Sequence, residues 1–337
     1  MFIINALKII FLLGFLVFIH EGGHFLAAKF FGVNVEEFSI GFGPKIFTKK
    51  SKETQYCISA IPFGGYVRMT GENERVDIEG AFNKAKLSHR IIIVAAGAIV
   101  NIIFAIIIYY ILAMCSNQIA STTVKAILPD YAKNISSIEI GDKILEINNK
   151  KIRIRNDISD ALKDNHGEEI KLLVERNNEK IELKAIPSKY LDTDIYVLGV
   201  ELEETNNSFG EKIYYSFWET KSFIKSIGES LKLLFTGKVS VNQMTGPIGI
   251  SDMVAKTNGL YNFVYLLSLI SLSLGITNLL PIPALDGGRI VLLIIEGIRG
   301  KALKEEIELG IQSAGFIVLI LFSFYVSYND FLRVFMQ

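Results

Sequence analysis

The sequence predicts a polytopic α-helical membrane protein into which one water-exposed α+β domain is inserted. Hydrophobic residues make up 50% of the 337 residues, and the mean hydropathy of +0.37 exceeds that of an ordinary soluble domain. Four apolar runs, near residues 9–28, 91–115, 260–283 and 310–328, approach the roughly 20 residues that cross a bilayer as a helix. The stretch 121–210 is instead polar and alternates as strands do, which predicts a domain in water.

These patterns divide the chain into successive segments. The first apolar run is long and lacks a convincing cleavage site, so we interpret it as a retained helix rather than a signal peptide. The predicted segments are transmembrane helix 1 (1–31), a loop with a membrane-associated β-hairpin (32–90), transmembrane helix 2 (91–115), the inserted domain (121–205), an amphipathic helix (210–236), and transmembrane helices 3 (260–288) and 4 (310–328).

The basic residues predict the orientation in the membrane. Lys and Arg gather in the loop 29–90 and between the last two spans, so both loops should be cytoplasmic. We therefore expect a multi-pass protein of the cytoplasmic (inner) membrane whose two termini and inserted domain are extracytoplasmic. Cys57 and Cys115 then lie on opposite sides, so no disulfide is predicted. Charges balance at 35 basic and 35 acidic residues without a basic patch, so we expect no nucleic-acid partner.

Residues 20–24, His-Glu-Gly-Gly-His, lie at bilayer depth in the first run. Positions i and i+4 share one helix face, so His20 and His24 can reach one tetrahedral Zn²⁺ while Glu21 reaches a water molecule there. Ionisable side chains in lipid cost at least about 2.5 kcal/mol each, which favours a metal or a wet cavity over a chance match. Gly22 and Gly23 predict the close approach of another backbone, with ordinary small-residue packing as the alternative.

A third ligand is expected from residues 278–289, NLLPIPALDGGR, at the end of the third span. Pro281 and Pro283 cannot continue a regular helix, so the helix should break there and end at a flexible Gly-Gly turn. The break brings Asp286 to the depth of the histidines and places the zinc site toward the cytoplasmic side. The alternatives are a solvated Asp286 and, further beyond the break, Glu296 as the ligand.

The two segments together resemble the site-2 protease family of intramembrane zinc metalloproteases, in particular its bacterial sigma-factor-regulating branch. The resemblance covers almost the whole chain. Its motifs are HEGGH (20–24), FSIGFGPKIF (38–47), IPFGGYVRM (61–69), TGPIGI (245–250) and NLLPIPALDGG (278–288). The chain departs from relatives in carrying one PDZ-like unit where some have two, and Ala98 where proline is frequent.

The resemblance implies roles for individual residues. It implies three zinc ligands, which are His20, His24 and Asp286, and one catalytic base, Glu21. It also implies a substrate-handling segment that contains Asn278, Pro281 and Pro283.

Residues 55–69, QYCISAIPFGGYVRM, alternate apolar with small or polar positions around a proline and the pair Gly64 and Gly65. The pattern predicts a membrane-associated strand or hairpin with a free edge. We expect an unwound substrate to add to that edge as an extra strand, with the carboxamide of Asn278 bonded to the same backbone. A purely structural cover is the alternative.

The inserted domain is centred on residues 138–152, where a Gly-Asp turn, a strand, an Asn-Asn turn and another strand follow one another. With a short helix at 156–165 it resembles a PDZ domain, and residues 196–202 are the candidate loop for a peptide carboxylate. The alternative is a plug that only excludes bulky ectodomains. Apolar spacings of three and four predict the amphipathic helix at 210–236, either packed on the domain or acting as an interfacial gate.

We therefore predict a zinc endopeptidase, with Zn²⁺ as cofactor, that cuts transmembrane segments of single-span proteins in the lipid bilayer. Anti-sigma factors and remnant signal peptides are the substrates that the resemblance suggests, and the PDZ-like domain is a candidate binder of a peptide terminus. The alternatives are a non-catalytic PDZ-bearing scaffold and a metal or solute transporter. Glu21 between the two histidines favours the enzyme. Inverted repeats would favour a transporter, and none are evident in the sequence.

Overall fold

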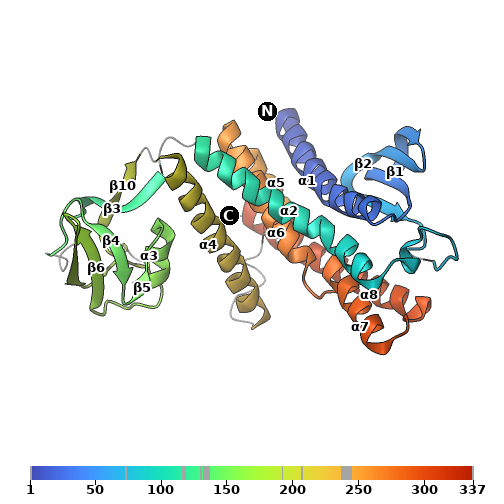
Figure 1. Cartoon of the computed structure of the whole chain (residues 1–337). Helices are drawn as coiled ribbons and strands as arrows, with labels where there is room; N and C mark the ends of the chain where they lie inside the picture. The colour runs from blue at the N-terminus through green and yellow to red at the C-terminus, as the bar shows by residue number, and fades with distance from the viewer. Residues whose placement is uncertain are drawn as a thin grey trace. The chain divides into compact units, whose positions relative to one another are not determined.

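The computed structural model describes residues 2–72, 74–115, 119–129, 131, 137–191, 193–205, 208–236 and 245–335 (Figure 1). The chain forms two compact units. The first unit consists of Met1–Ile108 and Leu231–Gln337, and the second of Tyr109–Ser230.

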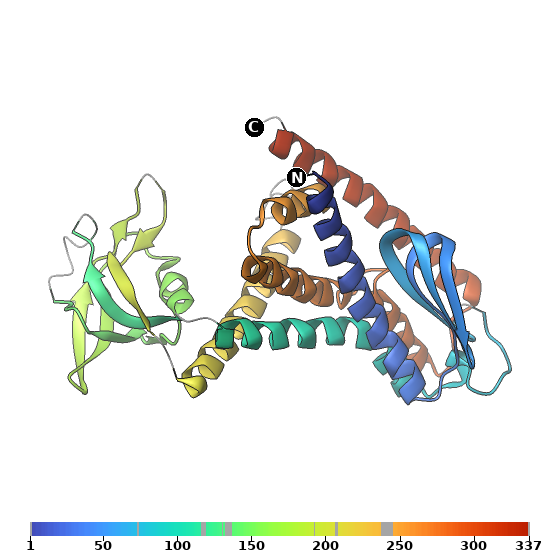
Figure 2. The same cartoon turned by 90° about the horizontal axis from the view of Figure 1, so that it is seen from above.

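Four helices among the described residues are long and apolar enough to cross a membrane. A helix satisfies its own backbone hydrogen bonds, which makes it stable in lipid. These helices are α1 (Phe2–Phe30), α2 (Leu87–Cys115), α6 (Leu260–Asn278) and α8 (Glu305–Phe335). Figure 2 shows α1 crossing α2. The predicted fold class, a polytopic helical membrane protein with an inserted PDZ-like domain, is confirmed.

The third apolar run is shorter as a helix than its sequence suggested. Helix α6 ends at Asn278, and a separate helix, α7 (Asp286–Arg299), begins after the prolines, which cannot continue α6. The prediction of a flexible Gly-Gly turn is wrong, because Gly287 and Gly288 belong to the first turn of α7.

A short helix, α5 (Pro247–Lys256), precedes α6 and begins with a proline, whose missing N–H would have had no partner at that position. The carboxylate of Asp330, fully buried in α8, accepts hydrogen bonds from the backbone N–H groups of Gly246 and Gly249, each at 2.8 Å. A carboxylate at a helix N-terminus satisfies free N–H groups and interacts favourably with the helix dipole. Asp330 therefore ties α5 to α8.

The hairpin consists of β1 (Val35–Ser51) and β2 (Thr54–Met69), and it folds on itself into a small antiparallel sheet. Residues 35–40 pair with residues 65–69 on one side and with residues 55–58 on the other. Residues 45–51 pair with the outer side of residues 54–59. The expected free edge along 55–69 therefore exists only in its last part, because 55–58 lie inside the sheet.

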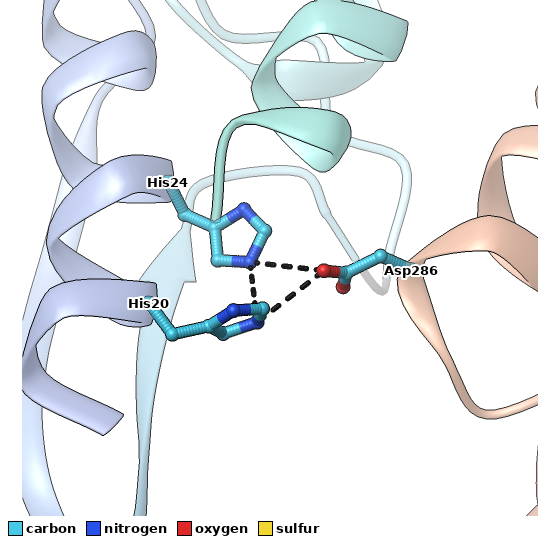
Figure 3. A group of neighbouring side chains, drawn as sticks. All are labelled: His20, His24 and Asp286. Atoms are coloured by element: carbon cyan, nitrogen blue, oxygen red, sulfur yellow. Dashed lines mark hydrogen bonds and ion pairs between the residues drawn. The ribbon is translucent and has the colours of Figure 1, made fainter. Parts of the chain in front are cut away.

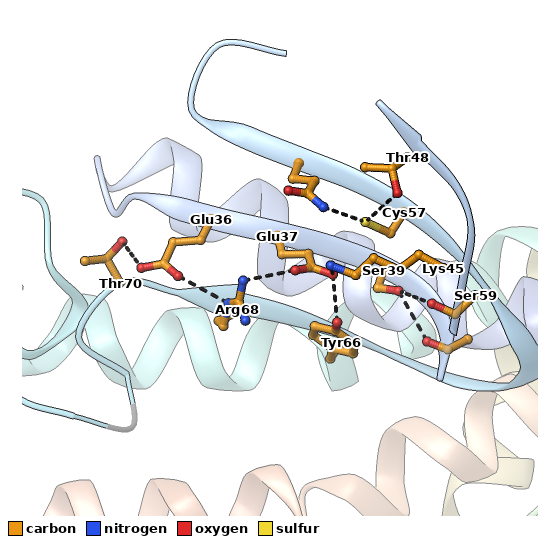
Figure 4. A network of polar contacts seen from close by, with 12 residues as sticks. Glu36, Glu37, Ser39, Lys45, Thr48, Cys57, Ser59, Tyr66, Arg68 and Thr70 are labelled. Atoms are coloured by element: carbon orange, nitrogen blue, oxygen red, sulfur yellow. Dashed lines mark hydrogen bonds and ion pairs between the residues drawn. The ribbon is translucent and has the colours of Figure 1, made fainter. Parts of the chain in front are cut away.

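Glu37 joins three segments of this sheet (Figure 4). Its side chain is 1% exposed and accepts hydrogen bonds from the hydroxyl of Tyr66 at 2.7 Å and from Arg68 at 3.0 Å, and it pairs with Lys45 at 2.6 Å. Burial opposes ionisation, but the hydrogen bonds from Lys45 and Tyr66 hold the pKa of Glu37 below its ordinary value. The network therefore links residues 35–40, 45–51 and 65–69 of the hairpin.

Two clusters of buried apolar side chains pack α1 against its neighbouring elements. One cluster joins α1 to the hairpin, to α2, to α7 and to the 3₁₀ turn Phe82–Lys84. Its buried members are Ala28, Val33, Val35, Phe38, Val67, Met69, Phe82, Ile93, Val94 and Leu293. The cluster that joins α1, α5 and α6 consists of Leu12, Leu16, Val254, Leu266 and Leu267. The C-terminal half of α1 is therefore held against both the hairpin and α2.

The second unit contains a PDZ-like α+β domain and, after it, α4 (Phe209–Phe235) as far as Ser230. Its main sheet has the order β10-β3-β4-β6-β7, β5 pairs with β4, and β8 pairs with β9. The other elements are β3 (Ile119–Ile127), β4 (Lys143–Ile147), β5 (Lys150–Lys151), α3 (Arg155–Leu162), β6 (Ile170–Arg176), β7 (Glu179–Ala185), β8 (Ser188–Lys189), β9 (Tyr196–Val197) and β10 (Val200–Thr205). The expected Asn-Asn turn joins β4 to β5 with positive φ at Asn148 and Asn149, as tight hairpin turns require.

Asp142 is the one buried charged side chain among the described residues of this domain, and we expect its replacement to destabilise the domain in a pH-dependent way. It is 0% exposed and bonds Arg176 through both oxygens, at 2.7 and 2.8 Å. The hydrogen bonds from Arg176 lower the pKa of Asp142. The stabilisation is therefore present above the unfolded-state pKa, near 4, and is lost as pH falls through the lower folded-state pKa.

We expect Asp142→Asn to lower the free energy of unfolding of this domain by about 3 kcal/mol at pH 7 and by less near pH 3. Urea unfolding of the full chain, followed by the fluorescence of Trp218 in α4, measures this, since Trp218 is the chain's one tryptophan. The exposed Asp164→Asn is the matched control. An equal loss at both pH values would contradict the ionic explanation.

Candidate metal centre

His20 and His24 lie one turn apart on α1, and both side chains point at Asp286, the first residue of α7 (Figure 3). The Nε2 atoms of the histidines are 3.2 Å apart. Oδ2 of Asp286 lies 3.3 Å from Nε2 of His20 and 3.5 Å from Nε2 of His24. In the described part of the chain, this is the one group of three or more His, Cys, Asp or Glu side chains that could hold a metal ion.

The donor set fits zinc. Both histidine side chains are 12% exposed and Asp286 is 21% exposed, and Oδ2 of Asp286 is buried without a hydrogen-bond donor assigned to it among the described residues. Two imidazole nitrogens and one carboxylate oxygen match the protein ligands of catalytic zinc, whose fourth position is taken by water or substrate. A cation between these atoms would satisfy the buried oxygen.

The alternative ligand Glu296 and the chain's two other histidines make different contacts. Glu296 forms an ion pair with Arg90, with 2.7 Å between Oε1 and Nη1. His89 stacks on Phe31, and His166 contacts a tyrosine of the PDZ-like domain. The structure therefore brings together the three residues that the sequence favoured.

Glycines set the distance between α1 and α2. A Cβ added to Gly23 would lie 2.6 Å from the carbonyl oxygen of Ala96, and one added to Gly97 would overlap the ring of His24. A Cβ at Gly22 would meet nothing within 4 Å. The close backbone approach predicted for the glycine pair therefore applies to Gly23, and Gly97 provides the space for the His24 ring.

We expect Gly23→Ala to lower both the zinc content and the thermal stability of the chain, while Gly22→Ala lowers neither. The first substitution forces α2 away and costs about 1–3 kcal/mol, whereas the second gains about 1 kcal/mol of helix propensity without a clash. Elemental analysis and thermal unfolding of the detergent-solubilised chain measure the two effects. Equal behaviour of the two variants would contradict the packing argument.

Helix α8 holds the loop that delivers Asp286. Ala284 has a positive φ of 72°, and its backbone N–H donates to Oε1 of Gln312 at 2.7 Å. Pro283 lies against Gly315, where a Cβ would be 2.6 Å from the proline's carbonyl oxygen. Left-handed backbone at a non-glycine residue costs energy, so it persists only where its surroundings hold it.

Glu21 and the predicted substrate-binding residues differ in their neighbours and in their exposure. A Cβ on Gly65 of β2 would lie 3.3 Å from Cγ of Glu21, so the hairpin borders the Glu21 side chain. Gly64 has a positive φ of 101° and borders Phe42 instead. Asn278 ends α6 half-buried, and Pro281 is exposed in the following loop.

A cavity of about 610 Å³ opens beside Asp286. Its lining includes polar side chains from the loop before α2, from α7 and from α8, namely Glu72, Arg289, Glu305, Glu308, Gln312 and Ser313. Arg289 and Glu72 form an ion pair across it. The cavity therefore reaches Asp286 from the side of α7 and α8.

Sequence reasoning missed the residues that support the ligands. Nδ1 of His24 lies 2.9 Å from the carbonyl oxygen of Ile93, and Nδ1 of His20 lies 3.2 Å from the side-chain nitrogen of Asn101, both on α2. Asn101 could have been found, because a polar side chain in an apolar span is usually functional. The backbone carbonyl of Ile93 and the loop support from Gln312 leave no comparable signal.

The sequence matches peptidase family M50 over residues 8–322. The Regulator of sigma-W protease RasP of Bacillus subtilis is 31% identical over 423 residues, covering 100% of both chains. Zinc metalloprotease RasP of Bacillus licheniformis is 30% identical, covering 98% of this chain and 100% of that one. A protein of Clostridium acetobutylicum is 37% identical over 97% of both chains.

Among solved structures, the PDZ domain of the SdrC-like protein from Listeria monocytogenes matches 26% of this chain and 88% of its own, with 15% identity and a TM-score of 0.21. The family that the motifs resemble and the zinc cofactor are both confirmed by the matches to family M50 and to its named zinc metalloproteases. The chain therefore belongs to peptidase family M50, the site-2 proteases, and is an intramembrane zinc metalloprotease.

Proposed function

We propose that this protease cuts single-span membrane proteins with a zinc ion held by His20, His24 and Asp286, and with Glu21 as general acid and base. The observation that carries the proposal is the convergence of three donor atoms from α1 and α7 within 3.5 Å of one another. Zinc supplies Lewis acidity, which polarises a peptide carbonyl and makes water nucleophilic at neutral pH.

Glu21 supplies the proton transfers in this proposal. Its carboxylate lies on the same turn as the two histidines and beside the hairpin, so it can take a proton from the attacking water. The protonated carboxyl group can then return that proton to the leaving amine. The two histidines are held in place meanwhile by their contacts with Ile93 and Asn101 of α2.

The substrate must be unwound before cleavage, because a helix engages its carbonyls in hydrogen bonds. We infer that the unwound segment pairs with residues 65–69, which form an edge of the hairpin sheet beside Glu21. Gly65, Asn278 and the Pro281–Pro283 segment would then contact the substrate backbone. This arrangement would place the cleaved bond next to the candidate centre.

We also propose the orientation of the chain in the membrane, the class of its substrates and a peptide-binding role for the PDZ-like domain. The distribution of Lys and Arg supports a cytoplasmic zinc site and extracytoplasmic termini and PDZ-like domain. The B. subtilis relative is named a regulator of sigma-W, which favours membrane-anchored anti-sigma factors as substrates over remnant signal peptides. A cavity of about 810 Å³ between α3 and β10, lined by Ile158, Leu162, Tyr196, Leu198 and Gly199, suits an extended peptide terminus.

Digestion of a purified single-span substrate by the detergent-solubilised chain tests the proposal. We expect mass spectrometry to place the cut within the apolar segment, and a zinc chelator to abolish cutting until zinc is restored. A cut confined to the polar flanks, or full activity after chelation, would contradict it.

A further inference from the structure

We propose that Asn101 is the positioning residue for His20, whose Nδ1–H donates a hydrogen bond to the carboxamide oxygen of Asn101. This hydrogen bond holds the imidazole in the tautomer that presents Nε2 to the metal. The inference rests on the proposed zinc site and adds a partner from α2, a helix that contributes no ligand.

The tautomer follows from the geometry of the three donors. Nε2 of His20 faces Nε2 of His24 and Oδ2 of Asp286, at 3.2 and 3.3 Å. A neutral imidazole carries its proton on one nitrogen, so a lone pair on Nε2 places the proton on Nδ1. Nδ1–H then needs an acceptor, as metal-bound histidines generally have.

His24 already has such an acceptor. Its Nδ1 lies 2.9 Å from the carbonyl oxygen of Ile93, an atom that can only accept. The proton of His24 therefore sits on Nδ1, and its Nε2 is free to bind a metal. Ile93 and Asn101 both belong to α2, two turns apart, so one helix faces the outer nitrogens of both histidines.

The carboxamide of Asn101 is the group that faces Nδ1 of His20. Its nitrogen lies 3.2 Å from Nδ1, while its oxygen is buried and has no hydrogen-bond partner among the described residues. With Nδ1 protonated, two donors would oppose each other. A half-turn of the carboxamide exchanges the two atoms without changing its shape, and it gives both Nδ1–H and the buried oxygen a partner.

An amide suits this position better than a carboxylate because it can serve both states of the histidine. Without a metal, the Asn101 nitrogen donates to an unprotonated Nδ1, and Nε2–H faces Asp286. With a metal, the oxygen accepts. The backbone of Asn101 is held in place meanwhile, because the residue is 0% exposed and its carbonyl oxygen accepts from the hydroxyl of Ser271 at 3.0 Å.

Zinc affinity of the full chain in detergent, measured by competition with a chromogenic chelator, tests the proposal. Asn101→Leu keeps the size and removes the acceptor, and we expect it to weaken zinc binding about 10–100-fold. Asn101→Asp keeps an acceptor and removes the donor, so it should bind zinc at least as tightly as the wild type. Ser268→Ala is the matched control, because Ser268 is buried in α6 and, among the described residues, its hydroxyl bonds only to the carbonyl oxygen of Tyr265 in the same helix.

The outcomes separate the inference from the proposed metal site. Unchanged affinity in Asn101→Leu overturns the inference, and so does a loss in Asn101→Asp equal to that in Asn101→Leu. If Asn101→Leu does not fold, Asn101→Asp alone decides, since a 10-fold loss contradicts an accepting role. Unchanged zinc affinity in His20→Ala would instead refute the metal site itself.

Discussion

Glu21→Gln should abolish proteolysis while the chain keeps its zinc. The amide has nearly the shape of the carboxylate but cannot take a proton from water, and loss of a general base typically lowers the rate about 10²–10⁴-fold. None of the three converging donor atoms belongs to Glu21, so the zinc content should remain unchanged. Single-turnover cleavage of the single-span substrate and elemental analysis of the same preparation measure both quantities.

The control for this experiment is Glu203→Gln, which makes the same chemical change on the exposed surface of β10. It should cleave at the wild-type rate. Wild-type cleavage by Glu21→Gln would refute Glu21 as the base, whereas loss of zinc from that variant would show a structural effect instead.

Asp286→Ala should lose both zinc and activity. Removal of one of the three proposed zinc ligands should weaken zinc binding by more than about 100-fold, which exceeds the loss expected when a residue that only hydrogen-bonds to a ligand is removed. It also leaves the two histidines without the carboxylate that lies 3.3 and 3.5 Å from them. Chelator competition measures the affinity, and the cleavage assay measures the activity at saturating zinc.

Glu308→Gln is the control, because Glu308 lines the same cavity as Asp286 without joining the donor group. Its zinc affinity should match the wild type. Unchanged affinity in Asp286→Ala would remove Asp286 from the metal site but leave the assignment of Glu21 intact.

The parts of the site that depend on local geometry could be predicted from the sequence. Residues at i and i+4 of a helix share a face, so the positions of His20 and His24 followed from their spacing. Asp286 required a further argument, that prolines break an apolar helix at bilayer depth. That argument placed the residue correctly but assigned Gly287 and Gly288 to a turn, because nothing local indicated that α7 begins there.

The remaining parts depend on contacts between residues far apart in the sequence. Gln312 supports Ala284, and Asp330 caps α5, across 28 and 81 or more positions. Such pairs leave no periodic pattern in a single sequence. For the same reason, the sequence did not predict that residues 35–40 pair with 65–69 on one side and with 55–58 on the other. Alternation of apolar and polar residues indicates a strand without identifying its neighbours.

The donor group draws on α1 and α7, two elements separated by most of the chain. A polypeptide still emerging from the ribosome therefore cannot assemble the centre until Asp286 has been synthesised and inserted. During nearly all of its own synthesis, the growing chain therefore lacks one of the three donor atoms of this group.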